Sequence, residues 1–408
     1  MATLKPFRAL RPARDKAAKV SAVPYDVVTT EEARALAAGN PLSFLHVSRA
    51  EIDLPDGTDP HSDAVYAKAA ENFGTLKRLA PLTLESAPAL YVYRLRTGPH
   101  AQTGIAGCSS LDEYDADVIR KHERTRKDKE DDRTRHMVTL KAQTGPVFMT
   151  YRDLDAIDAL VKQASREEPL FDFSAPDGVA HTVWRLSQES TARMADAFRE
   201  VPLFYIADGH HRAASASRAR AGLKKANHGH KGDEDYNFFL TVLFPAKQLK
   251  ILPYNRAVKD LAGRTPEELM GELRSRFTLR EGSQAAPTRK GDINIYLDGR
   301  WHGLTLPKPS GGGAIEALDA DLLHRHILEP LLNIKDIRTD ERIDFVGGIR
   351  GTKGLEKLVH DGQAAIAFSL HPVSLDELIA ISDANEIMPP KSTWFEPKLR
   401  DGLLIHMI

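Results

Sequence analysis

The hydrophobic pattern of the chain alternates between short apolar runs and segments with helical spacing. Val65, Ala69, Phe73 and Leu76 recur at helical intervals, which predicts a helix over residues 64–79. Runs of strand length predict strands at 43–47, 89–96, 147–151, 203–207, 238–244 and 364–370. Because such runs and helical segments alternate along the whole chain, the pattern predicts a mixed α/β (α+β) fold with a mixed sheet.

Length and helix-start signals add a division into domains. The 408 residues exceed what one ordinary core supports. Pro245 closes the apolar run 238–244, and beyond it Thr265 followed by Pro266 marks a new helix start. We therefore predict one domain over residues 1–245 and a C-terminal α/β domain over residues 246–408.

The stretch 113–136 is dense in charges of both signs, and we predict that it forms one polar helix. Residues that would share one face of this helix are His122, Thr125, Lys129, Asp132 and His136. Such a stripe could line a cleft. The plainer interpretation is a solvated face held together by ion pairs four residues apart, such as Asp117 with Lys121 and Asp131 with Arg135.

Composition narrows the classes of function. The formal net charge of −1 lacks the basic excess typical of nucleic-acid binding, so nucleic acid is not an expected partner. Cys108 is the only cysteine, which excludes an intrachain disulfide and a thiolate zinc cluster. No apolar run of about 18 residues and no signal-like start occur, so we expect a cytoplasmic protein without a membrane partner. The oligomeric state stays open, a homo-oligomer included.

The segment Asp208-Gly209-His210-His211-Arg212 carries the clearest chemical signal. It joins the apolar run 203–207 to an alanine-rich helical segment, and a strand that feeds a helix presents the first N–H groups of that helix to an anion. Gly209 lets a ligand approach the backbone, and Arg212 can grip an oxyanion with two N–H groups. We interpret the segment as a phosphate-binding turn.

Residues beside this turn could add to its chemistry, and other interpretations of the turn are possible. Ser215 lies one helical turn further on and could add a hydroxyl, and Asp208 is placed to hold a metal or a proton. A plain structural turn is one alternative. A metal site at His210 and His211 is another, but adjacent histidines at a helix start do not easily face one ion.

Two segments nearer the C-terminus are less specific candidates for binding or catalysis. The glycines and arginines of residues 340–350 could cradle an anion, or form a glycine hairpin. The proline-rich segment 388–398 predicts a stiff loop with functional side chains, or else a terminal wrap that buries Trp394.

Four segments together resemble a widespread bacterial family catalogued as a domain of unknown function. They are Lys5–Ala9, Lys121–Thr125, Ala207–Arg212 and Met388–Pro397, and the resemblance extends from Lys5 to His406. The Asp208–Arg212 turn is also similar to the phosphate-binding box of the ParB/sulfiredoxin-like superfamily, which includes free-serine kinases. The resemblance implies a ParB/sulfiredoxin-like catalytic core and ATP-dependent phosphorylation of free L-serine to O-phosphoserine.

The resemblance implies which residues bind the nucleotide. Gly209, His210, His211 and Arg212 would hold the phosphates of ATP. Lys121, Arg126 and Arg133 would neutralise charge on the transferred phosphoryl group, because catalysis of this reaction is mainly positioning and electrostatics.

The resemblance also implies the catalytic residues Glu123, Asp208 and His122. Glu123, next to His122 in the Lys121–Thr125 segment, would take the proton of the serine hydroxyl. Asp208 would hold Mg²⁺ or assist that base. The sequence contains neither a Walker-type phosphate loop nor the protein-kinase motif set, so a kinase activity would use a different scaffold.

Three other interpretations compete with a serine kinase. The protein could be a nucleotide-binding switch or a nucleoside-triphosphate hydrolase of ParB-like type, with no small-molecule acceptor. It could be a relative of DNA-segregation proteins, which the neutral charge and the lack of a helix-turn-helix signature disfavour. It could also be a structural protein without catalysis.

Overall fold

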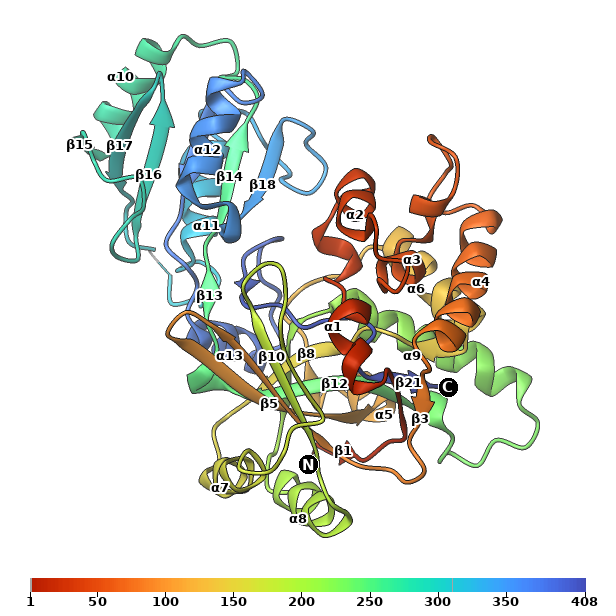
Figure 1. Ribbon diagram of the computed structural model, residues 1–408. Coiled ribbons are helices and arrows are strands. Elements are labelled where there is room, and N and C mark those ends of the chain that lie inside the picture. Colours follow the sequence, from red (N-terminus) through yellow and green to blue (C-terminus); the bar gives the residue numbers. More distant parts are fainter. Residues whose placement is uncertain (1, 310) are drawn as a thin grey trace. The chain divides into compact units, whose positions relative to one another are not determined.

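The computed structural model describes residues 2–309 and 311–408, and their contacts divide the chain into two units (Figure 1). The first unit holds the residues up to Lys121, then Thr125–Leu249 and Pro397–Ile408. The second holds His122–Arg124 and Lys250–Glu396. Residues 397–408 thus group with the first unit. The division into functional domains 1–245 and 246–408 stays a prediction.

The first unit is built on a nine-stranded sheet, which confirms the mixed α/β fold. Its strand order is β6 (Ile119–Arg120), β11 (Phe204–Asp208), β8 (Val147–Tyr151), β12 (Phe238–Pro245), β5 (His100–Ser110), β4 (Tyr91–Thr97), β10 (Ala180–Arg185) and β9 (Phe171–Ser174), with β1 (Leu4–Lys5) beside β5. The pairs β6–β11 and β8–β12 are parallel and the others antiparallel, so the sheet is mixed as predicted.

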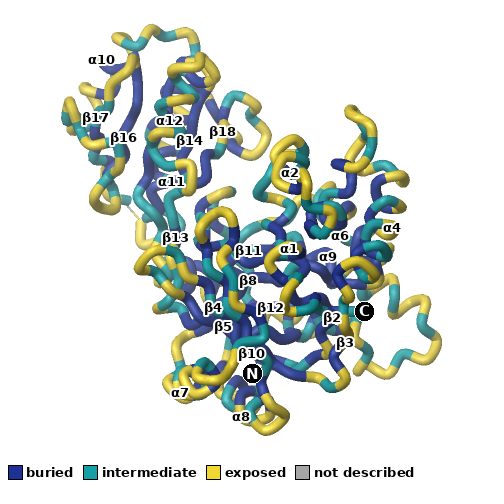
Figure 2. Tube along the Cα trace, viewed as in Figure 1, coloured by how far each residue is buried: buried dark blue, intermediate teal, exposed yellow. Residues whose placement is uncertain are grey.

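Continuous apolar runs become the buried middle of this sheet. All five residues of β8 are buried, and so are seven of the eight residues of β12 (Figure 2). Such strands need cover on both faces. The helices that contribute to the same apolar cluster include α5 (Leu111–Asp115), α7 (Asp155–Ala164), α8 (Gln188–Phe198) and α9 (His210–Ala226).

A second apolar cluster holds a helical layer within the same unit. Its elements are α1 (Ala17–Val20), α2 (Thr30–Ala37), α3 (Leu45–Ser48), α4 (Asp63–Leu79) and α6 (Lys127–Leu140). A small sheet runs beside it, in the order β3 (Thr83–Leu84), β2 (Ala9–Arg11), β21 (Ile405–Met407) and β7 (Ala142–Gln143). The pairing of β2 with β21 joins segments from opposite ends of the chain.

The predictions for this layer had mixed outcomes. The helix predicted over 64–79 is confirmed as α4. The strand predicted at 43–47 is wrong, because that segment enters the one-turn helix α3. Leu45 and Val47 are both buried there, and two apolar residues spaced by two cannot distinguish a strand from a single helical turn.

The single helix predicted over 113–136 is also wrong. The segment contains α5, then β6, then an extended stretch up to Arg126, and α6 begins only at Lys127. His122 and Thr125 therefore do not share a helical face with Lys129, Asp132 and His136. Residues 120–136 contain no apolar side chain, so no hydrophobic period marks where a helix starts.

Gly402 offers a test of this packing. Its φ is +83°, and a Cβ there would lie 2.5 Å from Cδ2 of the buried Phe44. Because the substitution adds both backbone strain and overpacking, we expect Gly402→Ala to lower the free energy of unfolding by about 2–4 kcal/mol. Gly39→Ala is the matched control, since Gly39 has φ +73° and open space around it. Equal losses in urea unfolding would contradict the packing argument.

The second unit holds a six-stranded antiparallel sheet. Its order is β15 (Thr278–Glu281), β17 (Arg300–Thr305), β16 (Asp292–Leu297), β19 (Ile366–Ser369), β14 (Tyr254–Val258) and β18 (Ile343–Gly347). Neighbouring residues of one strand enter different apolar clusters: Ile295 packs with α10 (Pro266–Arg276) and α11 (Asp319–Leu323), and Tyr296 packs with α12 (Gly351–His360). Helices therefore cover both faces of this sheet (Figure 1).

The remaining elements of the second unit are α13 (Leu375–Asp383) and the short pair β13 (Ile251–Leu252) with β20 (Trp394–Phe395). The predicted helix start at Thr265 is confirmed, with a capping box and Pro266 in the first position. The glycine hairpin considered for 340–350 is wrong, because Ile343–Gly347 pairs with β14 instead. Gly347 packs against the Trp394 ring, which leaves no room for a side chain there.

In the part of the chain that the structure describes, no helix is both long enough and apolar enough to cross a membrane.

Candidate active site

The predicted phosphate-binding turn has the local structure that the sequence indicated. Strand β11 ends at Asp208, Gly209 adopts φ +96°, and α9 begins at His210. Glycine suits this left-handed conformation because it lacks a Cβ. A Cβ at Gly209 would also lie 3.0 Å from Nε of Arg212, so the guanidinium group packs directly against the turn.

Asp208 is held between two cations. Its Oδ2 accepts a hydrogen bond from Nζ of Lys398 at 2.9 Å and lies 3.6 Å from Nη2 of Arg212. Burial alone would raise the pKa of this carboxyl group, but Lys398 and Arg212 lower it well below its usual range. A carboxylate with so low a pKa is a poor proton acceptor at neutral pH.

The same contacts argue against Asp208 as a magnesium ligand. One carboxylate already paired with two cations does not fit the oxygen-rich environment that Mg²⁺ requires. Among residues 2–309 and 311–408, no group of three or more His, Cys, Asp or Glu is arranged to hold a metal ion. We therefore derive no step through a protein-bound metal.

Arg212 is buried, with 5% of its surface exposed. It donates a hydrogen bond to the carbonyl oxygen of Pro146, and its Nε has no hydrogen-bond partner among the described residues. A buried N–H group without a partner is costly, which makes it a candidate for binding an anion.

The charged segment and the turn come together because α6 packs along α9. The backbone N–H of Arg126 donates to Nε2 of His211 at 3.1 Å. Ser215 is fully buried, and its hydroxyl donates to the carbonyl oxygen of Glu130 at 3.1 Å. Ser215 thus joins the two helices in the structure, and its proposed role as a phosphate ligand would require that contact to open.

The cationic residues predicted around the phosphoryl group lie in different settings. Lys121 pairs with Asp117 at 2.7 Å, as predicted. Arg126 pairs with Asp128 on the surface. Arg133 is mostly buried, forms an ion pair with Asp132 at 2.7 Å and stacks over the ring of Tyr25. Arg133 lines a cavity.

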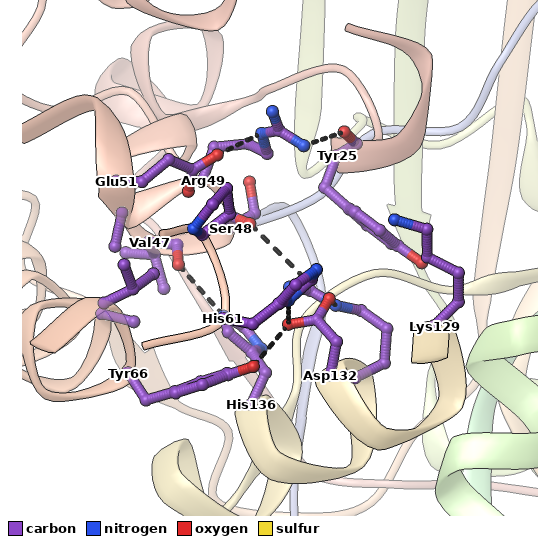
Figure 3. Close-up of a pocket in the computed structure, with 15 residues that line it drawn as sticks. Tyr25, Val47, Ser48, Arg49, Glu51, His61, Tyr66, Lys129, Asp132 and His136 are labelled. Carbon is purple, nitrogen blue, oxygen red and sulfur yellow. Dashed lines mark hydrogen bonds and ion pairs between the residues drawn. The ribbon is translucent and has the colours of Figure 1, made fainter. Parts of the chain in front are cut away.

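That cavity has a volume of about 240 Å³ and lies between α3, α4 and α6 (Figure 3). Asp132 accepts a hydrogen bond from the Tyr66 hydroxyl at 2.8 Å. Burial would raise the pKa of Asp132, but Arg133 and the Tyr66 hydrogen bond keep it below the usual value. His136 Nε2 lies 3.0 Å from the carbonyl oxygen of Val47, and burial lowers its pKa to about 4, so it is neutral at pH 7.

Asp401 is a candidate that sequence reasoning missed. It lines a small cavity of about 20 Å³ together with Arg133, His136 and Arg212. Its side chain packs against Gly145, and its Oδ1 is buried without a hydrogen-bond partner among the described residues. Burial raises the pKa of Asp401 to about 7, against the opposing effect of Arg212. In the sequence, Asp401 is marked only by its position four residues after the family segment that ends at Pro397.

The raised pKa of Asp401 predicts a pH dependence of stability. Between about pH 3.9, the usual aspartate pKa, and about pH 7, the folded protein keeps the Asp401 proton that the unfolded chain has released. The free energy of unfolding therefore falls as pH rises through this window, by up to about 1.4 kcal/mol per pH unit for one proton. Asp401→Asn should lack this fall, so its stability relative to the parent protein should increase from pH 4 to pH 7.

Urea unfolding at several pH values measures this difference. Groups such as His136, whose lowered pKa acts in the opposite direction, are present in both proteins and cancel. The exposed Asp298 supplies the control, because Asp298→Asn should leave the pH profile unchanged. If the free energy of unfolding depends on pH in the same way for Asp401→Asn and the parent protein, Asp401 does not keep its proton in this pH range.

His122 and Glu123 group with the second unit. The carbonyl oxygen of His122 accepts a hydrogen bond from the backbone N–H of Met388 at 2.9 Å, and its Nε2 lies 3.4 Å from Oγ1 of Thr393. Two of the four family segments, Lys121–Thr125 and Met388–Pro397, therefore contact each other. Trp394 in the latter is half-buried and donates to Glu396 at 3.0 Å.

Solved structures that resemble this chain do so with low TM-scores, as three of them show. A free serine kinase in complex with AMP has a TM-score of 0.36 and 13% identity, over 74% of this chain and 89% of that chain. SbnI from Staphylococcus aureus has a TM-score of 0.36 and 12% identity, over 71% of this chain and 82% of that chain. A conserved hypothetical protein from Pyrococcus furiosus has a TM-score of 0.34 and 13% identity, over 73% of this chain and 94% of that chain. Scores this low carry no argument about the function of this chain.

A family model gives a firmer result. No curated protein matches the sequence. The model described as "Protein of unknown function (DUF1015)" matches residues 4–321, which include three of the four family segments, up to and including the Asp208–Arg212 turn. The resemblance to a bacterial family of unknown function is thereby confirmed, and the chain belongs to the DUF1015 family.

Proposed function

We propose that this protein transfers the γ-phosphoryl group of ATP to the hydroxyl group of free L-serine, giving O-phosphoserine and ADP. The observation that carries the proposal is the turn at Gly209, where the left-handed glycine, the start of α9 and the buried Arg212 meet. A helix N-terminus with a close backbone approach and a guanidinium group suits a phosphate. The serine acceptor is inferred from the family segments.

Electrostatics support phosphate binding at this turn. Two cations, Arg212 and Lys398, lie at this turn beside the carboxylate of Asp208, and Asp26 supplies a further negative charge near Arg212. Arg133 lines the same small cavity as Arg212 and adds a third cation. ATP would arrive as its Mg²⁺ complex, with the ion held by the nucleotide and not by Asp208. Positioned cations are the main source of catalysis in phosphoryl transfer.

The proposed reaction is a single displacement at the γ-phosphorus. The serine Oγ forms a bond to phosphorus while the bond from phosphorus to the β,γ-bridging oxygen breaks, and ADP leaves. The hydroxyl proton passes to a base, for which we propose Glu123 from the Lys121–Thr125 family segment. Asp208 is less suited to this step, because its ion pairs lower its pKa.

The proposal is tested by ³¹P NMR of the full-length protein with ATP, Mg²⁺ and L-serine, beside a sample without serine. We expect a phosphoserine resonance that appears only with serine and is strongly reduced in Arg212→Ala, which lacks the guanidinium group of the turn. Asp361→Asn, at an exposed position in the second unit, is a control that should keep the activity. Release of inorganic phosphate without serine would instead identify a nucleotide hydrolase, and unchanged ATP would contradict both.

A further inference from the structure

The 240 Å³ cavity between α3, α4 and α6 is lined by residues outside the four family segments. Its walls come from four segments of the first unit: Tyr25, residues 47–51, five residues between 60 and 69, and one face of α6 (Figure 3). We call it the α3–α6 pocket. It is smaller than the roughly 300–1,000 Å³ of pockets for drug-sized ligands, so it suits a molecule of amino-acid size.

The charges that line the α3–α6 pocket are mixed and nearly balanced. Arg49 pairs with Glu51 at 2.8 Å, and Arg133 pairs with Asp132 at 2.7 Å. The side chain of Lys129 also lines the pocket; its charge acts on Asp128, but it makes no hydrogen bond or ion pair with the residues that the structure describes. The pocket thus has one cation in excess, which favours a ligand that brings a single negative charge.

The pocket also offers a place for a positive group. Asp132 is ionised at neutral pH and lies on the pocket wall, where Tyr66 and Arg133 fix its orientation. An α-amino acid carries its carboxylate and its ammonium group on one carbon atom. The combination of the excess cation Lys129 with the carboxylate of Asp132, three residues away on α6, matches this zwitterion better than it matches a phosphate.

The pocket is adjacent to the phosphate-binding turn. The small cavity that contains Arg212 and Asp401 shares Tyr25, Ser48, Arg133 and His136 with the α3–α6 pocket. Arg133 therefore lies between the two, and all of these residues belong to the first unit. A ligand in the pocket would therefore contact residues that also line the cavity of Arg212.

We propose that the α3–α6 pocket binds the amino-acid acceptor, with Lys129 facing its carboxylate and Asp132 its ammonium group. This inference rests on the proposed function, since it assigns the acceptor of the same reaction. It requires that both charged groups of the ligand contribute to affinity, and that removing Lys129 weakens acceptor binding without changing nucleotide binding.

The test is a saturation-transfer NMR titration of the full-length protein with L-serine and two analogues. Ethanolamine lacks the carboxylate of serine, and 3-hydroxypropionate lacks its ammonium group. We expect L-serine to bind and each analogue to bind at least 10-fold more weakly. Lys129→Met should weaken L-serine binding at least 10-fold and leave the Kd for ATP unchanged. Lys127→Met, an exposed change at the start of the same helix, should affect neither.

The outcomes separate this inference from the kinase proposal. If L-serine binding depends on Lys129 but no phosphoserine forms, the pocket assignment stands and the kinase proposal fails. If phosphoserine forms and Lys129→Met keeps the KM for serine of the parent protein, the pocket assignment is overturned and the kinase proposal stands. If L-serine neither binds nor is phosphorylated, both are overturned.

Discussion

Replacing Glu123 by glutamine should lower kcat for phosphoserine formation by roughly 10²–10⁴-fold, the usual contribution of a general base. The carboxamide has nearly the same shape as the carboxylate but cannot accept the serine proton, so the substitution removes the proposed base. The affinity for ATP should not change, because the proposed nucleotide contacts are at the Asp208–Arg212 turn. Single-turnover kinetics with serine, together with a nucleotide titration, measures the two quantities separately.

A matched control is Glu189→Gln, which makes the same chemical change at an exposed position in the first turn of α8. It should keep full activity. A Glu123→Gln protein with the turnover of the parent would remove Glu123 from the mechanism. Asp401 would then be the next candidate base, because its raised pKa of about 7 and its place beside Arg212 suit proton transfer at neutral pH.

The parts of the fold that the sequence predicted correctly are those with strong local signals. The five-residue apolar run before Asp208, the glycine and the alanine-rich segment each indicate one element, and together they predicted the join between β11 and α9. The same is true of Thr265, where a capping residue precedes an acidic first turn. Local chemistry is sufficient to specify such features.

The errors arose where tertiary contacts decide the structure. Residues 120–136 have no apolar side chain, so the start of α6 depends on its packing against α9 and not on any pattern of its own. The two-residue spacing of Leu45 and Val47 fitted a strand equally well, until burial in the helical layer favoured one helical turn.

The candidate site was only partly predictable for the same reason. The segment Asp208–Arg212 is contiguous and could be recognised, whereas the α3–α6 pocket assembles Tyr25, Arg49, Asp132 and their neighbours from distant parts of the chain. Lys398 and Asp401 reach the turn from the C-terminal end, by way of the contacts at residues 144–146. No spacing rule within one sequence brings such residues together.

Arg212→Ala should abolish most nucleotide binding, with an increase in Kd for ATP of at least 10-fold and a loss of stability. The guanidinium group is buried, donates to the Pro146 carbonyl oxygen and balances the charge of Asp208. Removing one partner of a buried ion pair costs about 3–5 kcal/mol. Lys398 still pairs with Asp208, so we expect a loss at the lower end of this range.

Because a loss of stability alone could reduce binding, Arg212→Lys provides a second test. It keeps the positive charge beside Asp208 but cannot bind a phosphate with two parallel N–H groups, so binding should weaken more than stability does. Arg218→Ala on the same helix is the control, since its ion pairs with Glu130 and Asp131 lie at the surface and contribute about 0–1 kcal/mol. Fluorescence titration with a labelled ATP analogue and urea unfolding give the two measurements. An Arg212→Lys protein that binds nucleotide as tightly as the parent would show that charge alone acts at this turn, and a folded Arg212→Ala protein with normal affinity would place the nucleotide elsewhere.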